Sequence, residues 1–288
     1  MSQVFHSKKV LITGAYGFTG QHLTPYLKEQ GYKVFSLKAD LLDKPALLDE
    51  ISNIEPEYVV HLAAISFVAE TDIDAIYKVN ITGSLNLLDA LVSYSSRPEK
   101  VILASSAAVY GKQVATVLNE SLCPSPVDHY GCSKLAMEHL SRNYNSYFPI
   151  VITRPFNYTG LGHADSFLIP KIIKAYKQRQ NCIELGSLDV SREFNDVRDI
   201  CNIYHRLLTE MTGSMFCNIC SSQTVSLMEI IQTMNNLSGY ELEVKVNPEL
   251  VRENEIKDLS GDVTKLNSII DYKFEYSLMD TLQWMYKC

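Results

Sequence analysis

Short apolar runs and segments with helical periodicity alternate along the first half of the chain. The apolar runs are continuous, as in strands that a sheet buries on both faces, and they cover 9–13, 33–37, 58–63, 101–105 and 150–153. Between them, apolar residues recur every three or four positions, which predicts helices directly after Gly20 and over 45–54, 79–94 and 130–147. This alternation predicts an α/β fold, a Rossmann-like doubly wound parallel sheet.

The alternation loses its regular order after Pro155. Helical periodicity covers 167–180, 196–209, 226–237 and 278–286, and one short apolar run covers 216–220. We therefore expect a large α/β domain over residues 1–155, which 190–225 rejoins, and a smaller C-terminal domain formed mainly by 156–288.

Composition narrows the class of protein. Of the 288 residues, 46% are apolar and 20% are charged, and the formal net charge is −7, which argues against disorder and against a nucleic-acid-binding surface. The chain has no apolar stretch of about 20 residues and no secretory leader pattern, so we expect a cytoplasmic protein without a membrane span. The seven scattered cysteines indicate free thiols. No cluster of His, Cys and acidic residues has metal-binding spacing, so we expect no metal.

A glycine-rich turn lies between the first apolar run and the first predicted helix. Gly14, Gly17 and Gly20 form a GxxGxxG pattern at this junction. Glycines permit a tight turn and the close approach of a pyrophosphate, and the N-terminus of the following helix offers unpaired N–H groups. The turn therefore predicts dinucleotide binding, with an ordinary glycine-rich connection as the alternative.

The residues after the second apolar run bear on which dinucleotide binds. Asp40 lies at about the distance from the glycines at which an acidic residue bonds the ribose hydroxyls of NAD. Asp40 can instead belong to the next loop and face the adenine, and Lys38 can meet a 2′-phosphate. We expect NADPH, with NAD as the alternative.

A YxxxK pair and a serine carry the candidate chemistry. Tyr130 and Lys134 are four residues apart on a predicted helix and therefore share one face of it. An ammonium there favours the phenolate and lowers the tyrosine pKa, which makes Tyr130 a general acid or base for a carbonyl. Ser106 ends an apolar run, at the sheet edge where such folds bind ligands, and we choose it over Ser105 as the residue that bonds the substrate oxygen.

Together these motifs resemble the extended short-chain dehydrogenase/reductase family, in its branch of nucleotide-sugar enzymes. The resemblance spans nearly the whole chain. Beside the glycine turn, the serines and the YxxxK pair, it rests on His61-Leu62-Ala63-Ala64, Asn80, Arg154-Pro155-Phe156-Asn157 and the segment 192–200. It implies an NAD(P)-binding first domain, a substrate-binding second domain, and a homodimer that pairs the helices 79–94 and 130–147.

The resemblance also implies further contact residues. For the cofactor, beside the three glycines, Lys38, Asp40 and Lys134, these are Tyr16, Phe18, Leu41, Leu62, Ala63, Ala64 and Asn80. For a nucleotide-diphosphate sugar substrate, beside Ser106 and Tyr130, these are Ser66, Ala107, Asn157, Arg192 and Arg252. Guanidinium groups suit a diphosphate. The connection from Leu37 to Asp40 is shorter than is usual in the family, which leaves the choice between NAD and NADP open.

Within this family, the position two residues after the catalytic serine separates the chemistries. The 4,6-dehydratases carry a carboxylate there, whereas this chain has Ala108. The segments 192–200 and 216–222 resemble the 4-keto-6-deoxyhexose reductases, especially those acting on GDP-4-keto-6-deoxymannose. We therefore expect NAD(P)H-dependent reduction of a C4 ketone on a nucleotide-linked 4-keto-6-deoxyhexose. The alternatives are a 4-epimerase that holds NAD tightly, a dTDP-linked 4-ketoreductase, and a non-catalytic cofactor-sensing protein.

Overall fold

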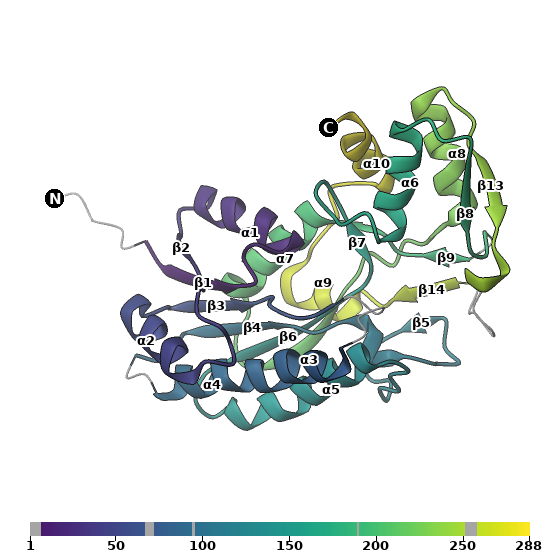
Figure 1. Ribbon diagram of the computed structural model, residues 1–288. Coiled ribbons are helices and arrows are strands. Elements are labelled where there is room, and N and C mark those ends of the chain that lie inside the picture. The colour runs from purple at the N-terminus through teal and green to yellow at the C-terminus, as the bar shows by residue number, and fades with distance from the viewer. Residues whose placement is uncertain (1–6, 67–71, 94–95, 189, 251–257) are drawn as a thin grey trace.

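A computed structural model describes residues 7–66, 72–93, 96–188, 190–250 and 258–288 (Figure 1). Its central sheet has six parallel strands in the order β11-β6-β4-β3-β1-β2. In chain order these are β1 (Lys9–Thr13), β2 (Lys33–Ser36), β3 (Tyr58–His61), β4 (Lys100–Ala104), β6 (Ile150–Pro155) and β11 (Met215–Ile219). The predicted Rossmann-like parallel sheet is confirmed.

Helices cover both faces of this sheet. One face packs against α1 (Phe18–Glu29), α7 (Val197–Glu210) and α9 (Thr264–Ile270), and the other against α2 (Lys44–Ile54), α4 (Ser84–Ser93) and α5 (His129–Ser141) (Figure 1). Successive side chains of a strand point to opposite faces, so Val10 and Ile12 join the first core and Leu11 joins the second. Because both faces are buried, the strands are apolar throughout.

The chain order reverses on the two sides of β1. β2 lies on one side of β1, and β3, β4, β6 and β11 follow in turn on the other. In such sheets ligands bind at the carboxyl ends of the strands, near this reversal. The glycine turn follows β1, and Ser106 follows β4, so both lie at this edge.

A smaller part of the molecule is built around a separate apolar core. This core joins α6 (Leu168–Lys177), α8 (Leu227–Ser238) and α10 (Leu278–Lys287) with the paired strands β8 (Cys182–Leu185) and β13 (Glu243–Val246). Short strands lie between the two parts: β5 (Val117–Leu118), β7 (Tyr158–Thr159), β9 (Ser191–Arg192), β10 (Asn195–Asp196), β12 (Val225–Ser226) and β14 (Asp258–Gly261). Two short helical segments are η2 (Ala107–Tyr110) and η4 (Pro248–Leu250).

Two predicted helices differ from the structure. The helix expected over 79–94 starts earlier, as α3 (Ile73–Tyr77), and runs through a π-helical segment η1 (Lys78–Gly83) into α4. The hydroxyl of Ser84, the first residue of α4, donates to the Asn80 carbonyl in η1 at 2.8 Å, a side-chain bond that periodicity does not reveal. The helix expected over 130–147 ends at Ser141 and continues as one 3₁₀ turn, η3 (Arg142–Tyr144).

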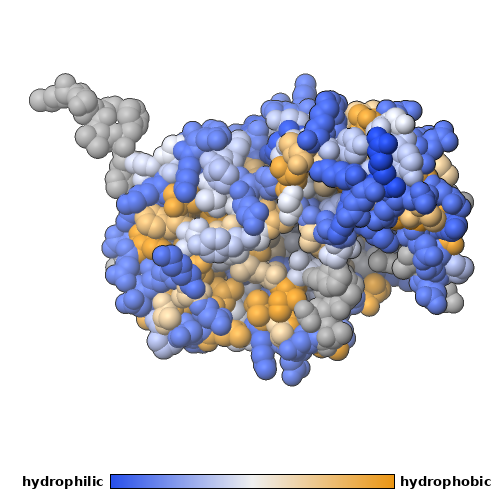
Figure 2. All heavy atoms as spheres, turned by 45° about the horizontal axis from the view of Figure 1, so that its top comes forward, coloured by the Kyte–Doolittle hydropathy of each residue, from blue (hydrophilic) through white to orange (hydrophobic). Residues whose placement is uncertain are grey.

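The surface carries both hydrophilic and apolar side chains. Figure 2 shows hydrophilic side chains over most of one face, with apolar side chains in scattered areas between them. Among the described residues, no helix has both the length and the apolar character needed to cross a bilayer.

Candidate functional site

The glycine turn is shaped by contacts that leave no space for side chains. Gly14 has a φ of +68°, and a Cβ on it would lie 2.7 Å from the Ala63 nitrogen. A Cβ on Gly20 would lie 2.4 Å from the Gly14 carbonyl oxygen, so the turn packs directly on α1. Gly17 is different, because its nearest contact would be 3.3 Å away and its φ is an ordinary −75°. Gly14 and Gly20 are therefore required by the fold itself.

The N-terminus of α1 has the properties of an anion site. No side chain caps it, and its first turn has no acidic residue. The first N–H groups of a helix have no partner within the helix and carry partial positive charge. A phosphate fits these donors, and Gly17 at the N-cap position leaves the approach open. Tyr16 is 71% exposed beside this turn.

Backbone contacts define the connection from β2 to α2. The Glu50 carboxylate accepts hydrogen bonds from the N–H groups of Lys38, at 3.0 and 3.1 Å, and Ala39, at 2.7 Å. The side chains of Lys38 and Asp40 are exposed, and Leu41 is buried with its carbonyl bonded by the Asn86 amide at 2.8 Å. A groove opens beside them and is lined by Asp40, Leu42, Asp43, Lys44, Pro45, Thr82 and Asn86.

A chain of neutral hydrogen bonds holds the loop after β3. His61 is buried between the Thr13 hydroxyl, 2.7 Å from its Nδ1, and the Ser84 hydroxyl, 2.8 Å from its Nε2. Because Ser84 donates to the Asn80 carbonyl, its oxygen is left to accept from His61 Nε2–H. Burial lowers the pKa of His61 to about 3, which keeps the ring neutral. The same Thr13 oxygen accepts from the Ala63 N–H at 3.1 Å.

Asn80 also holds this loop, through hydrogen bonds to its backbone. Its Oδ1 accepts from the Ile65 N–H at 2.8 Å, and its Nδ2 donates to the Ile65 carbonyl and to the Ser133 hydroxyl, both at 3.0 Å. Asn80 has no exposed surface, and its contacts position the loop. Its predicted contact with the cofactor stays a prediction. Leu62, Ala63 and Ala64 are half-buried on this loop, and Ser66 is exposed at its end.

Ser106, Tyr130 and Lys134 converge where β4 ends and α5 begins. Asp128 caps α5 by accepting from the Gly131 N–H at 2.7 Å, which places Tyr130 in the first turn. Ser106 precedes η2 and accepts from the Ala108 N–H at 3.1 Å, while its hydroxyl bonds the Tyr130 oxygen. The Lys134 ammonium lies 5.9 Å from the centre of the Tyr130 ring and donates to the Ala104 carbonyl at 2.7 Å.

The electrostatics of this trio differ from the expected ones. The sequence predicted that Lys134 lowers the pKa of Tyr130, but burial raises the pKa of Tyr130 well above its usual value, and the Ser106 hydrogen bond offsets only part of that rise. Burial also lowers the pKa of Lys134 to about 8, opposed by the Glu138 carboxylate. Desolvation disfavours both charged forms and is the largest cause of both shifts. Tyr130 is therefore protonated at neutral pH, as a proton donor requires.

A buried ion pair supports the trio and was not predicted. Glu138 follows Lys134 by one helical turn, and its carboxylate binds Arg154 Nε at 2.9 Å and Nη2 at 2.6 Å. The same carboxylate accepts the Ser105 hydroxyl at 2.6 Å. Ser105 is thus committed to this pair, which leaves Ser106 facing Tyr130. The i, i+4, i+8 spacing of Tyr130, Lys134 and Glu138 is the signal that could have revealed it.

The predicted substrate residues lie on several elements. Ser66, Ala107 and Asn157 follow the neighbouring strands β3, β4 and β6 at the carboxyl edge of the sheet. Arg192 lies in β9, outside that sheet, and its Nη1 donates to the Ser191 carbonyl at 2.7 Å. Arg252 lies outside the described residues.

The segment 192–200 serves mainly to join parts of the molecule. The buried Glu193 carboxylate accepts from the N–H groups of Gly261, at 2.5 Å, and Ser221, at 2.8 Å. β10 pairs with β7, which brings this segment beside the residues that follow β6. The segment thus connects the main sheet to the small strands. No group of three or more His, Cys, Asp or Glu side chains in the described part of the chain could hold a metal ion.

Comparison with known proteins assigns the family. The model of the NAD dependent epimerase/dehydratase family matches residues 10–220. The chain belongs to this family. The predicted family resemblance is confirmed, and the protein is an NAD(P)-dependent oxidoreductase.

Two relatives match the chain over nearly its full length. The chain is 36% identical to GDP-6-deoxy-D-talose 4-dehydrogenase from Aggregatibacter actinomycetemcomitans, covering 97% of both chains. It is 32% identical to GDP-6-deoxy-D-mannose reductase from Pseudomonas aeruginosa, covering 96% of this chain and 95% of the relative. The solved structure of RMD from Pseudomonas aeruginosa complexed with NADPH superposes with a TM-score of 0.87 at 30% identity, covering 98% of this chain and 97% of that one.

Proposed function

We propose that this protein reduces the C4 ketone of a GDP-linked 4-keto-6-deoxyhexose, with NADPH as the reductant. The observation that carries the proposal is the sequence similarity, over nearly the full length of the chain, to two enzymes that are named for GDP-6-deoxyhexoses. The convergence of Ser106, Tyr130 and Lys134 at the carboxyl edge of the sheet supports it. Ala108 at the position where the dehydratases carry a carboxylate favours a reductase over a dehydratase.

The cofactor site fits a dinucleotide. Gly17 and the uncapped N-terminus of α1 would hold the pyrophosphate, and the connection 37–41 would face the adenosine. The exposed Lys38 favours a 2′-phosphate, and the NADPH in the similar solved structure agrees with that choice. Bound NADPH supplies the hydride for the ketone carbon.

The chain's own residues handle the oxygen and its proton. Ser106 and Tyr130 would donate hydrogen bonds to the carbonyl oxygen, where negative charge develops in the transition state. Tyr130 gives up its proton to that oxygen, because its raised pKa keeps it protonated at neutral pH. The Lys134 ammonium lies close enough to the Tyr130 ring to stabilise the phenolate that remains.

The names of the two relatives differ in the sugar. 6-Deoxytalose and 6-deoxymannose are epimers at C4, so one 4-keto sugar yields either alcohol, depending on the face that is reduced. We propose that this chain uses that shared 4-keto sugar. The configuration of its product is read from the experiment.

The test is NADPH oxidation by the purified protein, followed at 340 nm, with GDP- and dTDP-4-keto-6-deoxyhexoses made in situ. We expect consumption with the GDP sugar, and product analysis by NMR then gives the C4 configuration. Tyr130→Phe lowers the rate by about 10²–10⁴-fold, the usual contribution of a positioned acid, with no loss of thermal stability. An epimerase is tested separately with GDP-6-deoxymannose and GDP-6-deoxytalose, which carry a C4 hydroxyl. Interconversion of these two sugars, with no NADPH oxidation on the 4-keto sugars, indicates an epimerase and refutes the proposal.

A further inference from the structure

Three aromatic rings form a continuous stack between the glycine turn and the smaller part of the molecule. The His163 ring lies 4.2 Å from the Phe18 ring at an interplanar angle of 12°, and 4.2 Å from the Phe167 ring at 29°. Phe18 is the first residue of α1, and Phe167 is the N-cap residue of α6. His163 lies in the loop 160–167 and thus connects two helices that belong to different cores.

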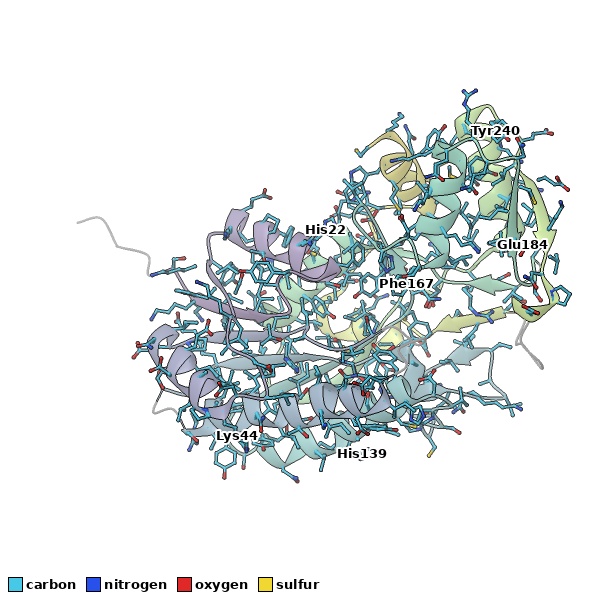
Figure 3. The ribbon with its side chains drawn as sticks, viewed as in Figure 1. His22, Lys44, His139, Phe167, Glu184 and Tyr240 are labelled. Carbon is cyan, nitrogen blue, oxygen red and sulfur yellow. The ribbon has the colours of Figure 1, made fainter. Side chains whose placement is uncertain are left out.

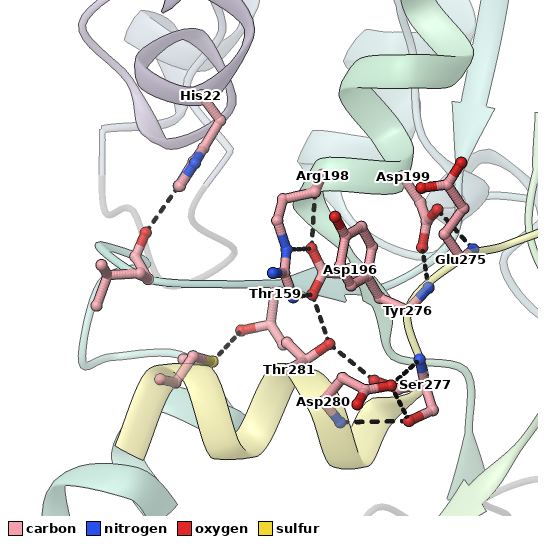
Figure 4. Close-up of polar contacts among 12 residues, drawn as sticks. His22, Thr159, Asp196, Arg198, Asp199, Glu275, Tyr276, Ser277, Asp280 and Thr281 are labelled. Atoms are coloured by element: carbon pink, nitrogen blue, oxygen red, sulfur yellow. Dashed lines mark hydrogen bonds and ion pairs between the residues drawn. The ribbon is translucent and has the colours of Figure 1, made fainter. Parts of the chain in front are cut away.

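The loop that carries His163 is also fastened to α1 by polar contacts. His22 Nε2 hydrogen-bonds the Leu161 carbonyl at 2.8 Å (Figure 4). Next to the loop, the Thr159 hydroxyl bonds His163 Nδ1 at 3.2 Å and helps to hold the ring in place. Figure 3 shows His22 and Phe167 where α1 approaches the start of α6. The loop is therefore attached to α1 by one hydrogen bond and by the stack of His163 on Phe18.

The Phe167 end of the stack is held by the packing of α6. α6 buries Ile169, Ile172, Ile173 and Tyr176 against α8 and α10, the core of the smaller part. At the α1 end of the stack, Phe18 supplies one of the free N–H groups at the anion-binding start of α1. Burial lowers the pKa of His163 to about 4, so the ring is neutral and stacks without the cost of desolvating a charge.

We propose that His163 is a positioning residue that couples the dinucleotide site on α1 to the nucleoside-diphosphate site of the smaller part. A ligand that fixes the start of α1 also fixes His163, Phe167 and the first turn of α6. The second ligand then meets a smaller part that is already oriented, and it binds more tightly. This inference rests on the proposed function, because it requires two ligands in one molecule.

The test measures binding rather than turnover. NADPH affinity is titrated by cofactor fluorescence, with and without saturating GDP, in the unmodified protein and in three variants. We expect GDP to tighten NADPH binding by about tenfold, within the usual range of coupling between sites. His163→Ala reduces that factor to less than about threefold while NADPH alone binds within about threefold of the unmodified protein.

Two variants separate the stack from its surroundings. His163→Phe keeps the aromatic contacts but loses the Thr159 bond, and we expect it to retain the coupling. His139→Ala is the matched control, because His139 is exposed on α5, across the sheet from α1 (Figure 3). The inference is overturned if GDP still tightens NADPH binding about tenfold in His163→Ala. It is also overturned if His163→Ala weakens NADPH binding by the same factor with and without GDP.

The outcome is separable from the proposed substrate. The same titration is run with dTDP and UDP in place of GDP. Coupling through His163 that appears only with another nucleoside diphosphate sustains the inference and refutes the GDP assignment. Absence of coupling with all three nucleotides refutes the inference, whatever sugar the protein reduces.

Discussion

Burial decides the properties of the reactive groups at the scale of single residues. Tyr130 and Lys134 share a helix face as their spacing predicts, yet burial is the largest cause of the pKa shift of each. Desolvation depends on every atom around a group, so the spacing of a motif gives the partners but not the protonation states. The pairing of Ser105 with Glu138 illustrates the same limit, because only the tertiary contact distinguishes the two adjacent serines.

The pKa of Lys134 predicts the pH dependence of reduction. Burial lowers this pKa to about 8, so the ammonium is present below pH 8 and is lost as the pH rises through that value. Tyr130 keeps its proton over the same range, because its own pKa is raised. We expect kcat/KM to fall about tenfold per pH unit above pH 8.

The measurement is a pH profile of kcat/KM from 6 to 10, with Lys134→Arg as the comparison. Arginine stays charged throughout this range, so the variant is expected to lose the alkaline decline even though its rate is lower. A decline that is unchanged in Lys134→Arg would assign it to another group.

At the scale of elements, the periodicity located most helices of the first half, and the failures have local causes. The π-helical segment η1 arises where Asn80 and Ser84 bond the backbone and the loop after β3. The helix α9 was not predicted, because its seven residues lie within a stretch where charges and Pro248 obscure the pattern. The Ser84 bond is a local one that competes with the regular helical bonds, and the Asn80 bonds reach Ile65 in the loop after β3, so hydrophobic periodicity reveals neither.

The glycine turn separates a structural glycine from a binding one. Gly20→Ala places a Cβ 2.4 Å from the Gly14 oxygen and 2.5 Å from the Ala15 Cα, so we expect a loss of about 1–3 kcal/mol in the free energy of unfolding. Gly17→Ala places its Cβ 3.3 Å from the Gly14 carbonyl oxygen, a much milder contact, so we expect it to lose less stability than Gly20→Ala. It should nevertheless weaken NADPH binding at least about tenfold, because its methyl group would face a pyrophosphate bound at the start of α1.

Urea unfolding and fluorescence titration of both variants distinguish these roles. Equal effects of the two substitutions on stability and on binding would contradict the distinction.

At the scale of the whole molecule, α7 holds the C-terminal segment against both parts. The buried Asp199 carboxylate accepts from the N–H groups of Glu275 and Tyr276 at 2.9 and 3.2 Å (Figure 4). It also accepts from the Tyr272 hydroxyl at 2.7 Å. Three residues before Asp199, Asp196 accepts the Thr281 hydroxyl of α10 at 2.6 Å. These contacts join the helix layer over the sheet to the core of the smaller part.

Asp199→Ala leaves these three donors without their acceptor. We expect a loss of about 3 kcal/mol or more in the free energy of unfolding, since each unsatisfied buried group costs about 1–3 kcal/mol. Asp165→Ala is the control, because Asp165 forms an exposed ion pair with Lys174 and such pairs contribute less than about 1 kcal/mol. Urea denaturation measures both, and similar losses in the two variants would show that the buried contacts contribute little.

The predicted homodimer stays a prediction, and α5 offers its test. Leu140 is 38% exposed on this helix, and the Tyr144 hydroxyl in the turn that follows bonds Asp89 of α4 at 2.6 Å. We expect the protein to sediment at about twice the 32.5 kDa chain mass and Leu140→Glu to sediment as a monomer. Met228→Glu on α8, where the side chain is 42% exposed, is the matched control and is expected to remain dimeric. Identical sedimentation of the two variants would exclude this interface.

The sequence alone determined the fold class, the glycine turn, the family and the candidate trio, because periodicity and short motifs are local properties of the chain. The tertiary structure decided what depends on packing between distant segments. It raised the pKa of Tyr130, committed Ser105 to Glu138, and bonded Asn80 to the loop after β3. It also stacked His163 between Phe18 and Phe167. The contacts of Ser105 with Glu138 and of Phe18 with His163 join residues that are distant in sequence, and only the folded sheet and its flanking helices bring them together.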